Sequence, residues 1–188
     1  MKKMLLSVGL LFAFCFLGFG QVDTVAVSKK LDSLIQNSRA LTNKQDFSKA
    51  LEVNDLAEKL ALGKLGAGSA AYGSVCFNYG RIYYMKADYQ PAEMWYIKAK
   101  SIREKTIGKE NPIYAQSLNN LALLYKAMGK FESAEPLFLE TIAIRQKVLG
   151  KEHPDYAKSL INLGGLYAAM DKFEKSILLF LESKVIQE

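Results

Sequence analysis

The sequence has few of the residues from which catalytic and metal sites are usually built. Its 188 residues include two cysteines, Cys15 and Cys76, and one histidine, His153. A metal centre needs several nitrogen, sulfur or oxygen ligands together, and a hydrolase triad needs a base beside its nucleophile. The sequence also lacks an HExxH motif, a GxSxG motif and a glycine-rich phosphate loop. We therefore predict that the chain is not an enzyme and that it uses no cofactor or metal ion.

Long apolar segments are absent except at the start of the chain. There, Lys2 and Lys3 precede an apolar run, 4–16, and the small residues Gly18 and Gly20 follow. Positive, apolar and small residues in this order are typical of a secretory signal peptide. An uncleaved anchor is the alternative, but the run is shorter than the ~20 residues of a spanning helix. We expect residues 1–20 to be removed and the protein to be periplasmic or extracellular, with no membrane span in the mature chain.

The remainder of the chain has one cysteine and only a modest net charge. Once the signal peptide is removed, Cys76 is the only cysteine, so a disulfide framework is excluded. Loss of Lys2 and Lys3 lowers the formal net charge from +6 to +4, and the excess is spread along the chain instead of forming a basic run. This distribution does not predict nucleic acid as a partner.

A repeat occupies the mature chain. "SLNNLALLYKAMGKF" starts at residue 117 and "SLINLGGLYAAMDKF" at 159, and 159 minus 117 gives a period of 42. Weaker copies precede them at the same spacing. One aromatic position recurs as Phe47, Tyr89, Phe131 and Phe173, and one closing glycine as Gly66, Gly108 and Gly150. The predicted units are 21–66 (a divergent first unit), 67–108, 109–150 and 151–188 (truncated at its C-terminal end).

Each unit has the pattern of two helices. Apolar residues recur three and four positions apart in 118–125, and again in 134–142. Pro112 and Pro154 suit the first turn of a helix, and Asn111 is a suitable cap before the first of them. A helix pair of this size cannot bury its apolar face alone, so neighbouring pairs are expected to stack into a solenoid.

These motifs resemble a known family. Leu121, Ala122, Tyr125, Ala134 and Phe138 resemble the pattern of the tetratricopeptide repeat. "LGKEHPDYAKSLINLGGLY" (149–167) and "GKFESAEPLFLETIAIRQKVLG" (129–150) are similar to the longer repeat of kinesin light chains. The resemblance implies an all-α, right-handed solenoid of antiparallel helix pairs, in which the first helix of each pair lines a concave groove. It also implies a scaffold for protein–protein interaction.

An amide recurs in the first helix of every unit. The column consists of Gln36, Asn78, Asn120 and Asn162. Amide groups can donate to and accept from the backbone of an extended peptide. In the family that the chain resembles, asparagine at this position commonly binds peptide, which implies that role for the three asparagines. The alternative is that the amides bond carbonyl groups of the neighbouring helix and only set the pitch of the solenoid.

Further residues are expected to face the same groove. They are Gln116, Asn119 and Lys126 in the third unit, Lys158 in the fourth, and Arg39 and Arg81, which occupy one repeat position in the first two units. Cations beside amides favour a peptide that carries an acidic side chain or a free carboxylate. Solvated helix charges without a ligand are the alternative for each cation.

The last predicted unit stops at Glu188, before the glycine expected at 192 (150 plus 42). Repeat arrays usually close with a polar capping element. We therefore expect self-association through the uncapped end. An alternative function is that of an N-terminal docking or sensing arm of a larger protein, since bacterial relatives with this repeat often continue into a caspase-like CHAT peptidase domain or a membrane signalling kinase.

Overall fold

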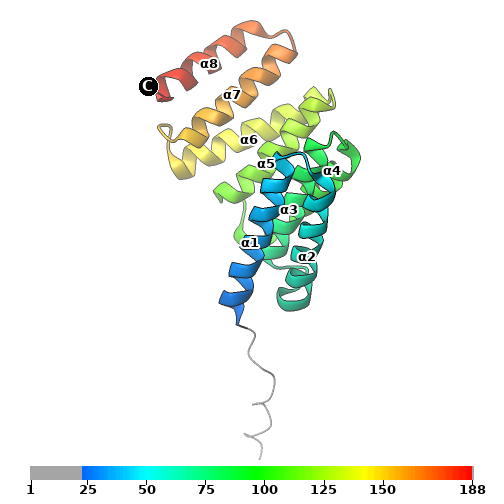
Figure 1. Ribbon diagram of the computed structural model, residues 1–188. Coiled ribbons are helices and arrows are strands. Elements are labelled where there is room, and N and C mark those ends of the chain that lie inside the picture. The colour runs from blue at the N-terminus through cyan, green and yellow to red at the C-terminus, as the bar shows by residue number, and fades with distance from the viewer. Residues whose placement is uncertain (1–22, 188) are drawn as a thin grey trace, which may run out of the picture.

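The computed structural model describes residues 23–187, which form eight α-helices and no strand (Figure 1). The helices are α1 (Thr24–Asn43), α2 (Phe47–Leu65), α3 (Ala70–Met85), α4 (Tyr89–Ile107), α5 (Pro112–Ala127), α6 (Phe131–Leu149), α7 (Pro154–Ala169) and α8 (Phe173–Gln187). The predicted signal peptide lies outside the described residues. None of the helices in the described part of the chain has the length and apolar character required to span a bilayer.

The turn inside each helix pair has the same backbone conformation. Its key residue has a positive φ of 58–72° and is Gln45, Ala87, Gly129 or Asp171. These four positions are 42 residues apart, and only one of them is glycine. The second helix of each pair then begins at the recurring aromatic position, at Phe47, Tyr89, Phe131 or Phe173. The repeat seen in the sequence is therefore a repeat of backbone geometry.

The connection between pairs is equally regular. Gly66, Gly108 and Gly150 follow the second helices with φ of 82–86°, a region that glycine adopts without strain. The next helix begins behind a side-chain cap: the Asn111 Oδ1 atom accepts from the Ile113 amide at 2.8 Å, and the His153 Nδ1 atom accepts from the Asp155 amide at 3.0 Å. The only histidine is thus part of a helix cap.

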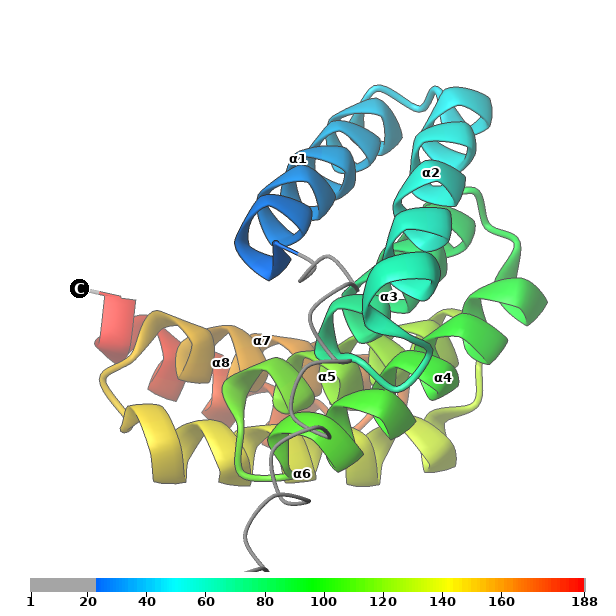
Figure 2. The ribbon, with the colours of Figure 1, turned by 90° about the horizontal axis from the view of Figure 1, so that it is seen from below.

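The helix pairs stack along the chain into a right-handed superhelix, with α1 and α8 at opposite ends (Figure 1). Each first helix contacts the first helix of the next pair, whereas the second helices, among the described residues, do not contact one another. The stack therefore curves with α1, α3, α5 and α7 on its inner side. Figure 2 shows the accompanying rotation, with the α1–α2 pair steeply inclined to α6.

In the core of each later pair, a large aromatic ring of the second helix packs against a small residue of the first helix. A β-carbon on Gly80 would lie 2.4 Å from the Tyr96 ring, and one on Gly164 would lie 2.9 Å from the Phe180 ring. Only glycine therefore allows these two approaches. In the first unit the corresponding residues are polar: Ser38 replaces the small residue and Asn54 the ring. Because of this difference, the side chain of Asn78, one of the predicted groove residues, lies in the core.

Candidate functional site

We define the inner face as the surface of the four first helices that points away from the second helices. All ten residues predicted for the groove lie on these helices: Gln36 and Arg39 on α1, Asn78 and Arg81 on α3, Gln116, Asn119, Asn120 and Lys126 on α5, and Lys158 and Asn162 on α7. Gln36, Gln116 and Lys158 are exposed, and Arg39, Arg81, Asn120, Lys126 and Asn162 are partly exposed. Asn119, also predicted to face the groove, is instead buried and only 7% exposed, because it packs between α5 and α7 and bonds Asn162.

Asn78 is a correction to the predicted amide column, because its side chain is fully buried. Its Nδ2 atom donates to the Ser38 Oγ atom and to the Asn54 Oδ1 atom, both at 2.9 Å. Asn54 in turn donates to the Val75 carbonyl at 3.3 Å. The polar replacements in the core of the first unit attract the amide inward, so Asn78 joins the first two helix pairs and presents no atom to a ligand.

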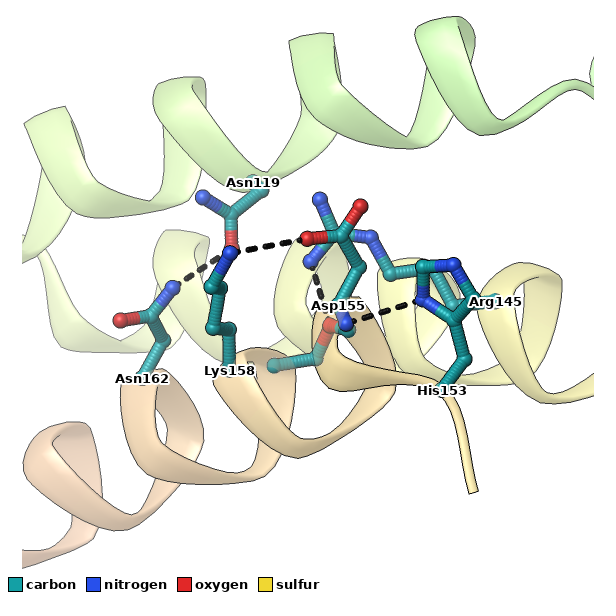
Figure 3. A network of polar contacts seen from close by, with 7 residues as sticks. Asn119, Arg145, His153, Asp155, Lys158 and Asn162 are labelled. Atoms are coloured by element: carbon teal, nitrogen blue, oxygen red, sulfur yellow. Dashed lines mark hydrogen bonds and ion pairs between the residues drawn. The ribbon is translucent and has the colours of Figure 1, made fainter. Parts of the chain in front are cut away.

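The other two asparagines of the column keep contact with solvent and have different partners. Asn120 donates its amide to the Gln116 carbonyl within its own helix, at 2.9 Å. Asn162 on α7 donates to the Asn119 Oδ1 atom on α5 at 2.8 Å (Figure 3). The structure thus brings two predicted groove residues together as a bridge between neighbouring first helices. The equal spacing in sequence does not produce a uniform ladder of amides.

Two lysines flank the Asn119–Asn162 bridge. Lys158 pairs with Asp155 one turn earlier on α7, with 3.2 Å between nitrogen and oxygen (Figure 3). The Lys126 amine reaches across from α5 to α7, where a β-carbon on Gly165 would lie 2.8 Å from its nitrogen. The missing side chain at Gly165 therefore leaves room for this cation. Amides and ammonium groups lie next to each other on this part of the inner face.

A second group of cations lies where α1 meets α3. The Arg81 Nη2 atom donates to the Asn43 Oδ1 atom at 2.6 Å, and Arg81 lies near the partly buried Arg39. Burial lowers the pKa of Arg39 from its ordinary value, and the charge of Arg81 lowers it further, while Asp32 raises it. Within residues 23–187 no carboxylate is in ion-pair contact with either arginine. The two positive charges are therefore only weakly compensated.

Sequence reasoning missed the residues that couple one helix pair to the next. The buried Arg145 guanidinium donates to the Asp155 carbonyl and to the Ser159 hydroxyl, both at 2.8 Å. One unit earlier, Arg103 donates in the same way to Ser117, at 2.8 Å. Burial lowers the pKa of Arg103 to about 10, helped by the charge of Arg39. The signal that could have revealed these contacts is the recurrence of both the arginine and the serine at the repeat spacing.

A second coupling contact also recurs. Tyr125 donates its hydroxyl to Glu93 at 2.9 Å, and Tyr167 donates to Glu135 at 2.8 Å. Each carboxylate belongs to the preceding helix pair. This tyrosine position of the repeat therefore makes a polar contact across the junction between helix pairs.

The chemistry available on the inner face is that of recognition. Its described residues offer amide donors and acceptors and cationic groups, which suit hydrogen bonding and charge pairing. Among residues 23–187 no three histidine, cysteine, aspartate or glutamate side chains are grouped so that they could hold a metal ion. Burial raises the pKa of the Cys76 thiol to about 11, which makes it a poor nucleophile at neutral pH.

A sequence profile of the tetratricopeptide repeat matches residues 69–147 and 113–184, which together cover more than half of the chain. The chain belongs to the tetratricopeptide repeat family. Proteins of this family are generally scaffolds for protein–protein interaction without catalytic activity. No curated protein sequence matches this tetratricopeptide repeat protein.

Solved structures extend the likeness to repeats of the kinesin-light-chain type. BtubC (BKLC) from P. vanneervenii has a TM-score of 0.74 and 24% identity, over 84% of this chain and 63% of its own. A putative kinesin light chain from Podosopora anserina with nearly identical TPR-like repeats has a TM-score of 0.74 and 24% identity, over 86% of this chain and 76% of its own. The tetratricopeptide repeat chain thus spans less than two thirds of BtubC, and the likeness concerns the fold.

Proposed function

We propose that the protein is an exported scaffold that binds an extended segment of a partner protein along its inner face. The proposed segment carries an acidic side chain or a free C-terminal carboxylate. The observation that carries this proposal is the Arg39–Arg81 pair, two neighbouring guanidinium groups on the inner face without a carboxylate of the described chain in contact.

The arginine pair supports an anionic ligand group for an electrostatic reason. Burial lowers the pKa of Arg39, and the nearby charge of Arg81 lowers it further, so the charged form of Arg39 is disfavoured at this site. A ligand carboxylate between them would reduce this repulsion and accept charge-assisted hydrogen bonds from both guanidinium groups. The Asn43 amide oxygen already accepts from Arg81 and orients it across the α1–α3 boundary.

The amides of the inner face support an extended backbone as the rest of the ligand. Asn120 and Asn162 are only partly buried, so each keeps hydrogen-bonding capacity beyond its one internal contact. The buried Asn119 accepts from Asn162 and holds it in place, which lowers the entropy cost of presenting the remaining hydrogen-bonding atoms of Asn162. The nearby Lys126 and Lys158 would add charge contacts along the same ligand.

The test is selection of peptides from a random library displayed on phage, followed by anisotropy measurements on the selected synthetic peptides. We expect enrichment of acidic sequences or free carboxylates. The double variant R39Q/R81Q should bind the selected peptides at least about tenfold more weakly. The matched control is K59Q/K105Q, which removes the same charge from exposed positions on α2 and α4.

Two results would count against the proposal. One is selection of peptides without any acidic group. The other is an equal loss of peptide affinity in R39Q/R81Q and K59Q/K105Q, which would show that the loss comes from the change in net charge alone. Melting curves of both variants separate loss of binding from loss of folding.

Export is the second part of the proposal, and it rests on the positive, apolar and small residues at the start of the chain. The measurement is the N-terminal sequence of the protein recovered from outside the cytoplasm of a bacterial host, which should begin at Gln21. Recovery of an intact chain in the membrane fraction would instead support the anchor. We also infer that the inner face catalyses no reaction, since its amides and cations include no nucleophile paired with a base.

A further inference from the structure

A group of aromatic and charged residues lies where α2, α3 and α4 meet. The Lys98 ammonium group on α4 lies over the rings of Tyr72 and Trp95, 4.9 and 4.8 Å from their centroids. The Trp95 ring also stacks on Tyr79 of α3, with 4.3 Å between the two centroids. Aromatic faces attract a cation through the quadrupole of the ring. The ammonium group of the chain itself therefore occupies a cation-binding position.

Two carboxylates of α2 border this position. The Tyr79 hydroxyl lies 2.5 Å from the Asp55 Oδ1 atom and 2.9 Å from the Glu58 Oε2 atom. The Tyr72 hydroxyl donates to the Glu58 Oε1 atom at 3.0 Å and accepts from the Lys98 Nζ atom at 2.7 Å. In the described part of the chain, neither carboxylate is in ion-pair contact with a lysine or an arginine. The contacts that hold these two negative charges are with neutral hydroxyl groups.

The hydroxyl groups supply few protons for the two carboxylates. Burial raises the pKa of Tyr79 from its ordinary value, and Asp55 and Glu58 raise it further, so the hydroxyl keeps its proton at neutral pH. Because a hydroxyl has a single proton, Tyr79 donates to only one of the two carboxylates at a time. A ligand that brings both positive charge and further N–H donors would complete the pairing.

The repeat itself does not require these residues, because the two later junctions between helix pairs fill the same positions with leucine or isoleucine. Asp55, Tyr79 and Trp95 correspond to Ile97, Leu121 and Leu137 in one junction and to Leu139, Leu163 and Leu179 in the other. Helix pairs therefore stack without an aromatic pair or a carboxylate at these positions. The cluster is specific to the first junction and indicates a role besides folding.

The cluster is open to solvent on the side of the second helices. Asp55 and Lys98 are exposed, and Glu58 and Trp95 are partly exposed. The inner face belongs to the first helices, so this position is separate from the proposed peptide groove. The Lys98 side chain is long and exposed, so its ammonium group can turn into water while the helix stays in place.

We propose that this cluster is a second recognition site, which takes an arginine side chain of a partner protein in the place of the Lys98 ammonium group. A guanidinium group is planar and more weakly hydrated than an ammonium group, so it stacks better on the Trp95 ring and loses less on leaving water. Its N–H groups supply the donors that Asp55 and Glu58 share too few of. The displaced Lys98 gives up its contacts with the two rings and the Tyr72 hydroxyl and regains its hydration.

The test is a titration of the chain from Gln21 to Glu188 with the synthetic peptide acetyl-Gly-Arg-Gly-amide. Trp95 is the only tryptophan, so its fluorescence reports on this site. We expect a saturable change, because the guanidinium group stacks on the indole ring. The same peptide with citrulline has nearly the same shape without the charge and should give no change. The lysine peptide should bind at least about threefold more weakly.

Carboxylate variants test the contribution of charge. Asp55→Asn/Glu58→Gln removes both charges and keeps an oxygen acceptor for each tyrosine hydroxyl, so it should fold. It should bind the arginine peptide at least about tenfold more weakly than the parent chain. Glu132→Gln/Glu174→Gln is the matched control, since it removes the same charge from exposed positions on α6 and α8. Melting curves of both variants separate loss of binding from loss of folding.

Lys98→Ala tests the displacement step, at an exposed position of α4 where alanine suits a helix. It should bind the arginine peptide about threefold more tightly, because the ligand no longer competes with the internal ammonium group. An unchanged or lower affinity in this variant would contradict displacement of Lys98.

Four further results would overturn the proposal. The first is binding of the citrulline or the lysine peptide as tightly as the arginine peptide. The second is an equal loss of affinity in the carboxylate variant and its matched control. The third is the absence of a saturable fluorescence change in both the parent chain and K98A. The fourth is a loss of binding in R39Q/R81Q, which would place the arginine peptide on the inner face.

Discussion

The Asn162 side chain on α7 donates a 2.8 Å hydrogen bond to the Asn119 side chain on α5, and this contact joins two neighbouring first helices. The corresponding asparagine two units earlier, Asn78, also bonds across helices, but it does so inside the core, with Ser38 and Asn54. Residues at the same repeat position thus make a surface contact in one unit and belong to a buried hydrogen-bond network in another.

This difference predicts unequal effects on stability. Asn78→Ala removes the donor of two buried hydrogen bonds and leaves Asn54 Oδ1 without its partner. We expect the free energy of unfolding to fall by about 1–3 kcal/mol. Asn120→Ala, which loses one bond within its own helix, should cost less than about 1 kcal/mol. Urea denaturation of both variants measures the difference, and a greater loss in Asn120→Ala would contradict the assignment.

Arg145, which joins two helix pairs, should contribute more to the free energy of unfolding than an exposed charge on the same helix. Arg145→Met keeps the aliphatic volume but removes the buried guanidinium that donates to the Asp155 carbonyl and to the Ser159 hydroxyl, and it leaves the Asp155 carbonyl only the Ser159 hydroxyl as a side-chain donor. We expect a loss of about 2–3 kcal/mol in the free energy of unfolding. Lys147→Met removes only an exposed ion pair with Glu110 and should cost less than about 1 kcal/mol. Similar losses in both variants would mean that Arg145 does not couple the units.

The recurring turn offers a reciprocal pair of substitutions. Ala87 has a φ of 60°, which an L residue adopts at a cost. Gly129 at the same repeat position has a φ of 72°, and a β-carbon added there would meet no other atom within 4 Å. We expect Ala87→Gly to stabilise the protein by about 0.5 kcal/mol, and Gly129→Ala to destabilise it by about 1 kcal/mol. Thermal and urea unfolding of the two variants should shift in opposite directions. A shift in the same direction would contradict a purely conformational origin.

Stability should fall at alkaline pH because buried tyrosines must ionise when the chain unfolds. Burial raises the pKa of Tyr125 to about 12, helped by Glu93, and burial raises that of Tyr167 to about 12, helped by Glu135. In the unfolded chain a tyrosine has a pKa of about 10. The native state therefore binds more protons above pH ~10, so the free energy of unfolding decreases as the pH rises from about 10 to 12.

The tyrosine variants isolate this contribution. In Tyr125→Phe/Tyr167→Phe the decrease between pH ~10 and ~12 should be shallower than in the parent chain, because two proton-linked groups are gone. Urea denaturation at several pH values gives the slope, and phenolate absorbance follows the ionisation directly. An unchanged slope would show that these two tyrosines are not linked to unfolding.

The position of each helix was largely predictable from the sequence. The spacing of apolar residues, the prolines at 112 and 154 and the glycines at 66, 108 and 150 place the helices and their ends, because these are local properties of the chain. The same period identified Phe47, Tyr89, Phe131 and Phe173 as one position, and in the structure each of them begins a second helix.

The burial and the hydrogen-bond partners of individual polar side chains were not predictable in this way. Asn78 and Asn162 are equivalent in the sequence, yet Asn78 is drawn into the core because Ser38 and Asn54 lie beside it in the folded chain. Arg145 becomes a coupler only because the next helix places a carbonyl and a hydroxyl within its reach. The sequence by itself determined the repeating backbone, through local conformational preferences. The tertiary structure alone decided which amides and cations stay exposed on the inner face, because that depends on neighbours distant in sequence.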